Sequence, residues 1–508
     1  MRGRFIQIRG ILYFLGVLCI INGIIILTPL LTVIANWGYQ DEGLNTVMAF
    51  VLPSLISLCV GLLLRTLFDY ETMGSTSSML LCTLSWILIS AIGALPYVIG
   101  INSSYLNGYF EAMSGFTTTG ITVFSGLDQM PRSIILWRAL TQWLGGLGIL
   151  SFFLVIIFRG SGAHNIYSAE SHKIFSRRPV PGMFHTLKIL WRIYTFFTLL
   201  SIISLSIEGM PLFDSICHSL TALSTGGFSP HDASIEYYKF AGYRNFKLFE
   251  YTLTFFMMLG GINFLVHYRV LTGDLKALWD NSEIRLWWKL ILAFVVIIMV
   301  EHLYKSGLLS NIFQNGLRES SSEIEETFRY SIFQVVSIIT TTGFGTKDIG
   351  SSFFPVLSRQ LFLMMMVIGG CVGSTGGGIK VLRISILNKL MRRELFKIRV
   401  SDLASDGLVV DEKIVPNDEV HKVTSLFFYW IVFLIIGGGI TALFTKLGIA
   451  ESFSGMFSAL GNIGPCYISG PEMINIHPVV KITYIVGMLA GRLELLPVLM
   501  LFSKKAWK

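Results

Sequence analysis

Ten long apolar stretches are the feature that most restricts how this chain can fold. They lie roughly at residues 11–35, 47–68, 79–101, 133–158, 187–207, 248–272, 286–304, 354–391, 423–447 and 478–503. A bilayer core about 30 Å thick is crossed by about 20 apolar residues in a helix, so each stretch is long enough to span it. The chain is 53% hydrophobic and only 14% charged, which is not the balance of a soluble protein. The sequence therefore predicts an all-α integral membrane protein.

Basic residues predict how these helices are oriented. The first stretch is too long for the apolar region of a signal peptide and lacks an A-x-A cleavage site, so we expect it to be retained. If the N-terminus is inside, the inner loops and the tail hold Arg159, Lys173, Arg177, Arg178, Lys188, Arg192, Lys389, Arg392, Arg393, Lys397, Arg399, Lys504, Lys505 and Lys508. The outer loops hold Asp41, Glu42, Glu208, Asp214, Glu319, Glu323, Glu325 and Glu326. Positive residues concentrate inside, which predicts that both termini are cytoplasmic.

Several classes of function are disfavoured. The net charge of +8 is distributed by loop and not over one aromatic-rich polar face, so no nucleic-acid partner is expected. Six scattered cysteines contain no C-x-x-C pair, and no histidine spacing resembles a metal site. Neither a G-x-S-x-G motif nor paired intramembrane aspartates point to an enzyme. We expect a protein that is not an enzyme and that carries no cofactor.

Four short segments repeat along the chain. They are Ser114–Thr122 (SGFTTTGIT), Leu220–Ser229 (LTALSTGGFS), Ser337–Thr346 (SIITTTGFGT) and Ser458–Pro465 (SALGNIGP). Each ends a stretch of about 10–15 residues, which is too short to span but fits a re-entrant helix. The predicted unit is helix, pore loop and helix, used four times with pseudo-symmetry around one central pore. The repeats are expected at 73–160, 161–280, 281–400 and 401–508, after a two-helix extension at 1–72.

A second glycine landmark follows each loop and supports this register. The landmarks are Gly145-Gly146, Gly260-Gly261, Gly369-Gly370 and Gly491-Arg492, at intervals of 25, 34, 26 and 27 residues from Gly120, Gly226, Gly343 and Gly464. Glu111, Asp214 and Glu451 lie near three expected pore-helix starts, at the outer mouth. They are either cation-attracting groups or ordinary helix-start acids.

The loops have the chemistry of a cation filter. Irregular backbone inside a membrane is tolerated only where it is buried in protein or lines water, so the four loops must share one cavity. Potassium filters coordinate the ion with rings of backbone carbonyls, and glycine permits the required backbone conformation. The expected filter residues are Thr118, Thr119, Gly120, Ser224, Thr225, Gly226, Thr341, Thr342, Gly343, Asn462, Ile463 and Gly464, with K⁺ as their ligand.

The absence of charged side chains in these loops favours potassium. The negative ends of the pore-helix dipoles would stabilise a cation without any carboxylate. An anion pore would present rings of Arg or Lys, and a carboxylate-type calcium or sodium channel would present rings of Asp or Glu.

These motifs, with GGCVGSTGGGIK at 369–380 and GRLE at 491–494, resemble the Trk/Ktr/HKT superfamily of potassium transporters over nearly the whole chain. The two extra N-terminal helices resemble its TrkH branch. In plant relatives a serine at the first filter glycine is associated with sodium selectivity, so Gly120 implies a preference for potassium. The resemblance implies potassium uptake across a bacterial inner membrane. The alternative is a secondary transporter of another monovalent cation, sodium or ammonium.

The eighth stretch is expected to be broken. It carries Gly369, Gly370, Gly373, Gly376, Gly377 and Gly378, and each glycine costs a helix about 1 kcal/mol relative to alanine. The resemblance assigns this segment to an intramembrane gating loop, while close helix packing is the alternative. Arg492 lies in an apolar helix, where a charge should face the interior. The resemblance places it against the gating loop; the alternative is a carboxylate partner, for which Glu494 points to a different face.

The remaining expectations concern partners. The resemblance implies a cytoplasmic, nucleotide-binding regulatory ring of the TrkA type, for which the basic loops at 159–192 and 389–399 are the expected docking surface. It also implies a homodimer.

Overall fold

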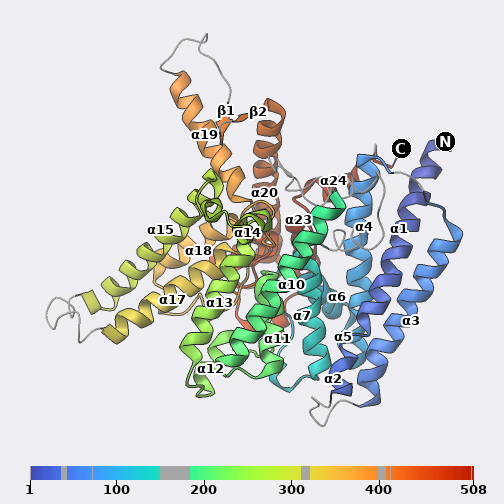
Figure 1. Ribbon diagram of the computed structural model, residues 1–508, viewed down its shortest axis with the longest axis horizontal. Coiled ribbons are helices and arrows are strands. Elements are labelled where there is room, and N and C mark those ends of the chain that lie inside the picture. Colours follow the sequence, from blue (N-terminus) through green and yellow to red (C-terminus); the bar gives the residue numbers. More distant parts are fainter. Residues whose placement is uncertain are drawn as a thin grey trace.

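The computed structural model describes residues 2–35, 43–70, 73–148, 183–309, 321–398, 408–411, 413–504 and 506–507 of the chain (Figure 1). The N-terminal helices are α1 (Arg2–Ile26), α2 (Leu30–Ile34) and α3 (Leu44–Leu67). Next come α4 (Ser75–Gly93), α5 (Leu95–Gly100), α6 (Tyr105–Phe116), the 3-10 turn η1 (Leu127–Gln129) and α7 (Arg132–Gly146). They are followed by α10 (Met183–Ile207), α11 (Leu212–Leu223), η2 (Ser234–Glu236), α12 (Tyr237–Phe240), α13 (Phe246–Gly261), α14 (Phe264–Leu271) and η3 (Leu275–Leu278).

The second half of the chain begins with α15 (Ser282–Lys305), α17 (Ser321–Ile339), α18 (Val356–Val367) and α19 (Val381–Lys397). An antiparallel hairpin of β1 (Leu408–Val410) and β2 (Lys413–Val415) follows. The last elements are α20 (Asn417–Phe444), α21 (Ile449–Gly461), α22 (Gly470–Ile474), α23 (Pro478–Arg492) and α24 (Leu496–Phe502). The predicted all-α class is confirmed, with one two-stranded hairpin among the described residues.

Six helical segments of the described chain are long and apolar enough to cross a membrane. They are Ile8–Ile34, Leu44–Leu67, Thr76–Gly100, His185–Ile207, Ser282–Lys305 and Asn417–Phe444. The pair α13 and α14 makes a seventh if it is counted as one span, although it bends by 105°. Residues 149–158 of the expected fourth stretch lie outside the described part of the chain.

Three of the ten expected stretches are broken helices. The expected break in the eighth separates α18 from α19. The sequence prediction of continuous helices was wrong at 248–272 and 478–503. The former bends between α13 and α14, and the latter breaks between α23 and α24 at Glu494 and Leu495, which both have positive φ. A break at membrane depth requires new partners for the freed backbone groups, and the breaks therefore point to specialised packing.

Four helices lie at corresponding places in the chain, each just before one of the four glycine loops: α6, α11, α17 and α21. Their C-terminal halves are almost wholly buried, and polar Ser and Thr side chains are prominent there. α11 packs against α7, α10 and α13, and α21 packs against α20 and α23. Polar side chains are costly against lipid, so these helix ends face protein. The buried Ser and Thr side chains mark the region where the four helices converge.

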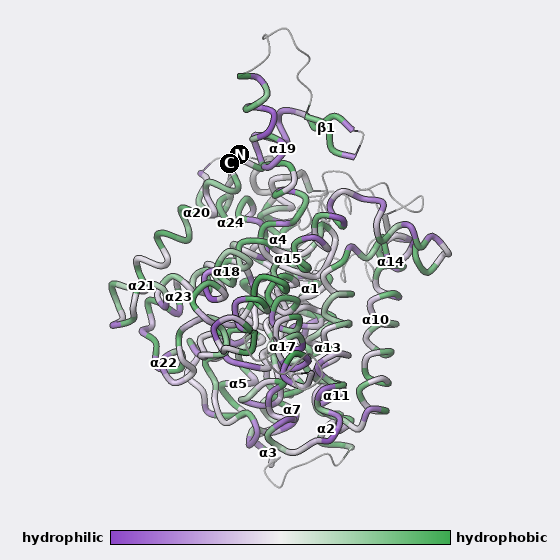
Figure 2. Tube along the Cα trace, turned by 90° about the vertical axis from the view of Figure 1, so that its left-hand side faces the viewer, coloured by the Kyte–Doolittle hydropathy of each residue, from purple (hydrophilic) through white to green (hydrophobic). Residues whose placement is uncertain are grey.

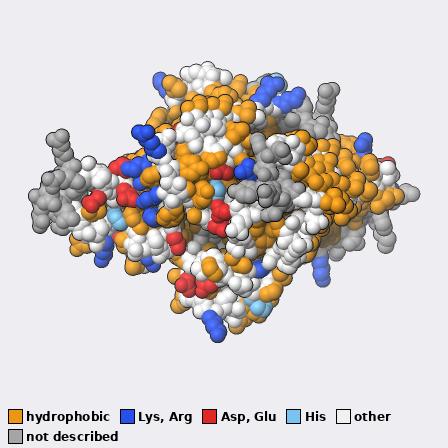
Figure 3. Space-filling model, turned by 90° about the horizontal axis from the view of Figure 1, so that it is seen from below, with side chains coloured by type: hydrophobic (Ala, Val, Ile, Leu, Met, Phe, Trp, Pro, Cys, Tyr) orange, Lys and Arg blue, Asp and Glu red, His pale blue; other side chains and the backbone are white. Residues whose placement is uncertain are grey.

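The two ends of the molecule differ. Both chain termini lie at the end from which α19 and the β1–β2 hairpin project, and Figure 2 shows the same arrangement after a 90° turn. Seen from the opposite end, acidic side chains lie near the middle of the face and hydrophobic ones dominate much of its flanks (Figure 3).

Candidate ion-conduction pathway

The four helices α6, α11, α17 and α21 end in the same way. The residue after the last turn has a left-handed backbone: Thr118 (φ 53°), Thr225 (φ 53°), Thr341 (φ 61°) and Asn462 (φ 55°). The next amide bonds back into the helix, from Thr119 to Ser114, Gly226 to Thr221, Thr342 to Ser337 and Ile463 to Ser458, at 2.9, 2.9, 2.8 and 3.1 Å. Left-handed threonine is strained because its Cβ is branched. Strain repeated at equivalent positions marks a functional site.

The loops that follow form a closed ring. The glycines Gly120, Gly227, Gly343 and Gly464 all have positive φ, between 77° and 109°. A Cβ added to each would meet the carbonyl oxygen of the neighbouring loop, namely those of Gly226, Thr342, Ile463 and Thr119 in that order. The distance would be under 3.0 Å at the first three and 3.1 Å at Gly464. Because loop 1 meets loop 2, loop 2 meets loop 3, loop 3 meets loop 4, and loop 4 meets loop 1, the four surround a common axis.

The ring corrects the expected register of the second loop. The sequence aligned Ser224, Thr225 and Gly226 with the other three loops, but the left-handed residue is Thr225 and the positive-φ glycine is Gly227. Gly226 occupies the carbonyl position of Thr119 and Thr342. Ser224 lies one residue earlier, at the C-terminus of α11, where its hydroxyl bonds Thr221 O at 3.2 Å. The local sequence Gly-Gly permits either register, and closure of the ring selects this one.

This register makes a prediction that separates the two glycines. Gly227→Ala should abolish cation uptake because its Cβ would strike the Thr342 carbonyl from a backbone with φ of 77°. Gly226→Ala should be milder, since the added methyl displaces only the end of the Gln142 side chain and its hydrogen bonds to Gly226 O and Phe228 N, not the backbone of another loop. Uptake into vesicles checks the order, and equal loss in both variants would contradict the corrected register.

Two oxygens beneath the ring have no partner. Thr118 Oγ1 and Asn462 Oδ1 are fully buried and make no hydrogen bond within the described part of the chain. The equivalent hydroxyls of the second and third loops bond to residues of the 369–380 segment. Gly377 N donates to Thr341 Oγ1 at 2.8 Å, and Thr225 Oγ1 donates to Thr375 Oγ1 at 3.2 Å. An orphaned buried oxygen is costly, so these two atoms fit ligands of an ion or its water.

A buried ion pair lies between the first two loops of the ring. Arg138 of α7 bonds Glu111 of α6 at 2.8 Å and Ser229 O of the second loop at 3.0 Å. Glu111 also accepts from the Thr122 hydroxyl at 2.9 Å and the Val123 amide at 3.2 Å. The expectation that Glu111 lies near the helix start, at the outer mouth, was wrong, because it sits in the middle of α6 with no exposed surface. The Glu111–Arg138 pair therefore links the first loop to the second.

The other two acids do lie in the first turns of their helices. Glu451 accepts from the Gly448 amide at 2.6 Å and caps α21, which is the role of an ordinary helix-start acid. Asp214 bonds Tyr238 at 3.0 Å and His231 at 3.1 Å.

Gln142 is a second brace. Its amide donates to Gly226 O at 2.7 Å and its oxygen accepts from Phe228 N at 3.0 Å. Between the fourth loop and the adjacent first loop, Asn462 donates to Thr119 Oγ1 at 2.8 Å; it also donates to Met488 O at 2.8 Å. Sequence reasoning missed Gln142 and Arg138. The available signal was two strongly polar residues in the 133–158 apolar stretch, which are expected to face protein.

The glycine-rich loop between α18 and α19 lies directly under the ring. It fills the bend between α13 and α14: Cys371 N bonds Gly261 O at 3.0 Å, Thr375 N bonds Gly260 O at 3.2 Å, and Phe264 N bonds Gly373 O at 3.1 Å. All six glycines singled out in the sequence, Gly369, Gly370, Gly373, Gly376, Gly377 and Gly378, belong to this loop. The loop therefore supplies the backbone partners that the broken helix lost.

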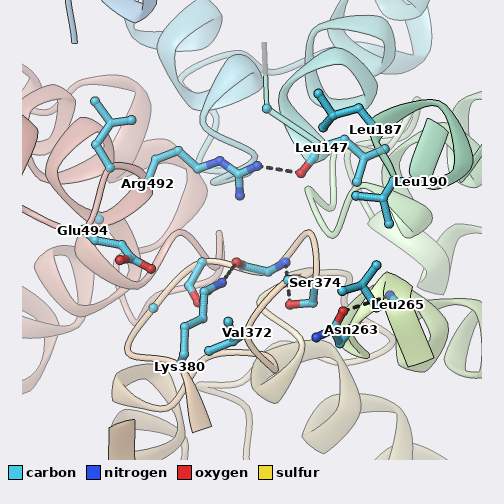
Figure 4. A pocket seen from close by; sticks show the side chains of 18 of the residues that line it. Leu147, Leu187, Leu190, Asn263, Leu265, Val372, Ser374, Lys380, Arg492 and Glu494 are labelled. Atoms are coloured by element: carbon cyan, nitrogen blue, oxygen red, sulfur yellow. Dashed lines mark hydrogen bonds between the residues drawn. The ribbon is translucent and has the colours of Figure 1, made fainter. Parts of the chain in front are cut away.

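Arg492 ends α23 and reaches this loop. Its guanidinium donates to Thr375 O at 2.7 Å and to Gly146 O at 2.7 Å, and it also bonds Gly145 O. It lines a cavity of about 100 Å³ together with the glycine loop, α7, α10 and α14. Figure 4 shows the side chain reaching toward Leu147. Glu494 pairs instead with Arg383 of α19. The expected contact between Arg492 and the loop is present.

His231 joins the segments that follow the first two glycine loops. Its ring lies between Asp128 (2.5 Å) and Asp214 (3.1 Å) and stacks on Tyr237 at 3.5 Å. Asp232 accepts from the Gly126 amide at 2.8 Å, which makes a second tie between the same segments. Burial lowers the pKa of His231, but the hydrogen bonds to Asp214 and Asp128 outweigh it and raise the pKa above 6.5.

This junction predicts a pH-dependent stability. Because the folded-state pKa is raised, the stabilisation is complete below the unfolded pKa and is lost as pH rises through the folded one. The melting temperature of the purified protein should fall as the pH rises past 6.5, the ordinary pKa of histidine, and His231→Gln should flatten that fall. His302→Gln is the control, since that ring bonds the Phe353 carbonyl. An unchanged pH profile in His231→Gln would contradict the assignment.

Comparison with known proteins decides the family. The TrkH family model, described as a cation transport protein, matches residues 46–508. The chain belongs to this family. Its members are transporters rather than enzymes, and the chain is a multi-pass membrane protein.

Individual relatives match over almost the whole length. The Trk system potassium uptake protein TrkH of Salmonella typhimurium is 32% identical over 510 residues, which covers 98% of this chain and 99% of the relative. The protein of the same name from Escherichia coli K12 is 31% identical over 514 residues, covering 98% and 99%. The crystal structure of the potassium transporter TrkH from Vibrio parahaemolyticus superposes with a TM-score of 0.82 at 27% identity, covering 99% and 100%. Fold and family therefore agree.

The expected docking surface is only partly described. Residues 159–182 and Arg399 lie outside the described residues. Lys188 and Arg192 are exposed on α10, and α19 carries exposed Arg392 beyond the body of the molecule.

Proposed function

We propose that the protein takes up potassium across a bacterial inner membrane through the ring of four loops. The observation that carries the proposal is the closed circuit in which each filter glycine abuts the carbonyl of the next loop. The circuit brings together four carbonyls, those of Thr119, Gly226, Thr342 and Ile463. A ring of backbone carbonyls is how a protein replaces the hydration shell of a potassium ion.

We attribute the selectivity to two features of the loops: they carry no charged side chain, and hydrogen bonds hold them in place. Gln142 holds the second loop to α7, Asn462 joins the fourth loop to the first, and the Glu111–Arg138 pair links the first loop to the second. The ring should select with moderate stringency, because its four quarters differ. At the left-handed position three quarters carry a threonine hydroxyl and the fourth carries Asn462.

The glycine loop is the proposed gate. It lies under the filter, contacts Thr225 and Thr341, and is held by Arg492. We propose that a cytoplasmic, nucleotide-binding ring protein of the TrkA type regulates it from the end where α19 projects, with both chain termini also cytoplasmic. The repeat boundaries and the homodimer stay proposals as well.

Ion flux tests the proposal. The purified chain in liposomes should carry K⁺ in preference to Na⁺ and ammonium under imposed gradients, and it should restore growth at low potassium to a strain that lacks potassium uptake. Equal or greater flux of sodium or ammonium would favour the alternative, a transporter of another monovalent cation on the same fold. Flux that needs a proton or sodium gradient would indicate coupling.

A further inference from the structure

Helix α15 holds both halves of the broken helix by their N-termini. Near its outer end, Glu301 accepts from the amides of Leu357 (2.9 Å) and Ser358 (2.6 Å) in the first turn of α18. At its inner end, Glu283 accepts from the amide of Leu382 (3.1 Å) in the first turn of α19. These amides have no partner within their own helices, so a carboxylate there satisfies them and favours the helix dipole.

Glu283 does one thing that Glu301 does not. The same oxygen, Oε1, also accepts from the amide of Val372 at 2.8 Å, inside the glycine loop. One buried carboxylate oxygen thus holds the loop and the helix after it in a fixed relation. A buried amide that loses its acceptor costs free energy, so both bonds favour this arrangement. The loop can leave its place relative to α19 only if one of these two bonds breaks.

The hairpin is tied to the same point. Asp411, at the turn between β1 and β2, accepts from the Ser282 amide at 3.0 Å, next to Glu283 in α15. The inner face of the hairpin forms a small apolar core with Leu382 of α19 and Val372 of the loop; its other members are Ile386, Leu408, Val410, Val415, Val420 and Val423. The loop, α19 and the hairpin are therefore packed as one unit around this carboxylate.

We infer that Glu283 is a positioning residue of the gate, which keeps the glycine loop closed under the filter by holding the Val372 and Leu382 amides together. The inference rests on the gate of the proposed function. It assigns a residue of α15, outside the glycine loop and distant in sequence from Arg492, to the closed state.

Potassium flux into liposomes, without any cytoplasmic protein added, tests the inference. Glu283→Leu should raise the flux about tenfold, the factor expected when a buried amide loses its acceptor. Glu283→Gln keeps an acceptor oxygen of the same reach and should stay closer to the wild type. Glu301→Leu is the matched control: it removes the same kind of cap from the same helix and should leave flux unchanged.

Two further measurements extend the test, one with a second variant and one with a readout other than flux. Leu382→Pro removes one of the two amides, and α5, α22 and α24 already accept proline as their second residue. It should raise flux by a smaller factor. Cys371, buried beside Val372, should react faster with a membrane-impermeant thiol reagent in Glu283→Leu when the other five cysteines are replaced.

The outcomes are distinct. Wild-type potassium flux with neither flux nor Cys371 labelling altered in Glu283→Leu and Leu382→Pro overturns the inference and leaves the proposed function standing. A wild-type chain without potassium flux overturns the proposed function, while labelling still judges the role of Glu283. If Glu283→Leu does not fold, Leu382→Pro decides.

Discussion

A Gly343→Ser chain is expected to lose potassium uptake, to less than about a hundredth of the wild-type rate. Backbone with φ of 89° costs a serine about 1–3 kcal/mol, and the added Cβ would lie under 3.0 Å from the Ile463 carbonyl. Either the loop moves or the carbonyl turns away, and both open the ring at the contact between loops 3 and 4. Uptake by a potassium-uptake-deficient strain at low external potassium measures the loss.

Gly345 provides a matched control two residues away. A Cβ added there meets only Lys347 O at 3.6 Å, which is an ordinary contact, so Gly345→Ser should retain uptake. Retained uptake in Gly343→Ser, with the protein present in the membrane, would argue against a filter formed by these loops.

Arg492→Ala should have the opposite effect and raise potassium flux about tenfold or more in liposomes without a regulator. The guanidinium joins the Thr375 carbonyl of the glycine loop to the end of α7, and each lost hydrogen bond to a charged group corresponds to about 1.5–3 kcal/mol. Without it the loop loses a tie to the first repeat. Arg492→Lys keeps the charge but not the planar fork, so an intermediate flux is expected.

The control for Arg492→Ala is Arg359→Ala. Arg359 also bonds backbone carbonyls, those of Phe354 at 2.8 Å and Ser351 at 3.0 Å, but it does so in the loop before α18, away from the glycine loop. It should change stability without raising flux. Unchanged flux in Arg492→Ala would rule out its part in the gate.

One assay separates the effect of the gate variant from that of the filter variant. Gly343→Ser combined with Arg492→Ala should conduct no potassium, because an open gate cannot replace a filter whose ring is broken. If the double variant instead conducts as Arg492→Ala does, the pathway lies elsewhere.

Much of the site could be predicted from local sequence. In three loops the sequence aligned the residues that the structure finds equivalent: Thr118, Thr341 and Asn462 have left-handed backbone, and Gly120, Gly343 and Gly464 follow two positions later with positive φ. The glycines of 369–378 were placed correctly in a helix break, since no continuous helix would carry six of them. The second loop failed because Thr-Gly-Gly offers two glycines and local sequence does not choose between them.

The sequence by itself determined the class, the four loops and the uncharged chemistry that favours a potassium ion, since these follow from apolar length and from residues adjacent in the chain. Only the tertiary structure decided which atoms meet. Asn462 reaches Thr119 across 343 positions, Gln142 reaches Gly226 across 84, and Glu283 reaches Leu382 across 99. Such contacts depend on how the ring closes and on which helix lies beside a break. Backbone groups freed by a break take their partners from whichever element packs there.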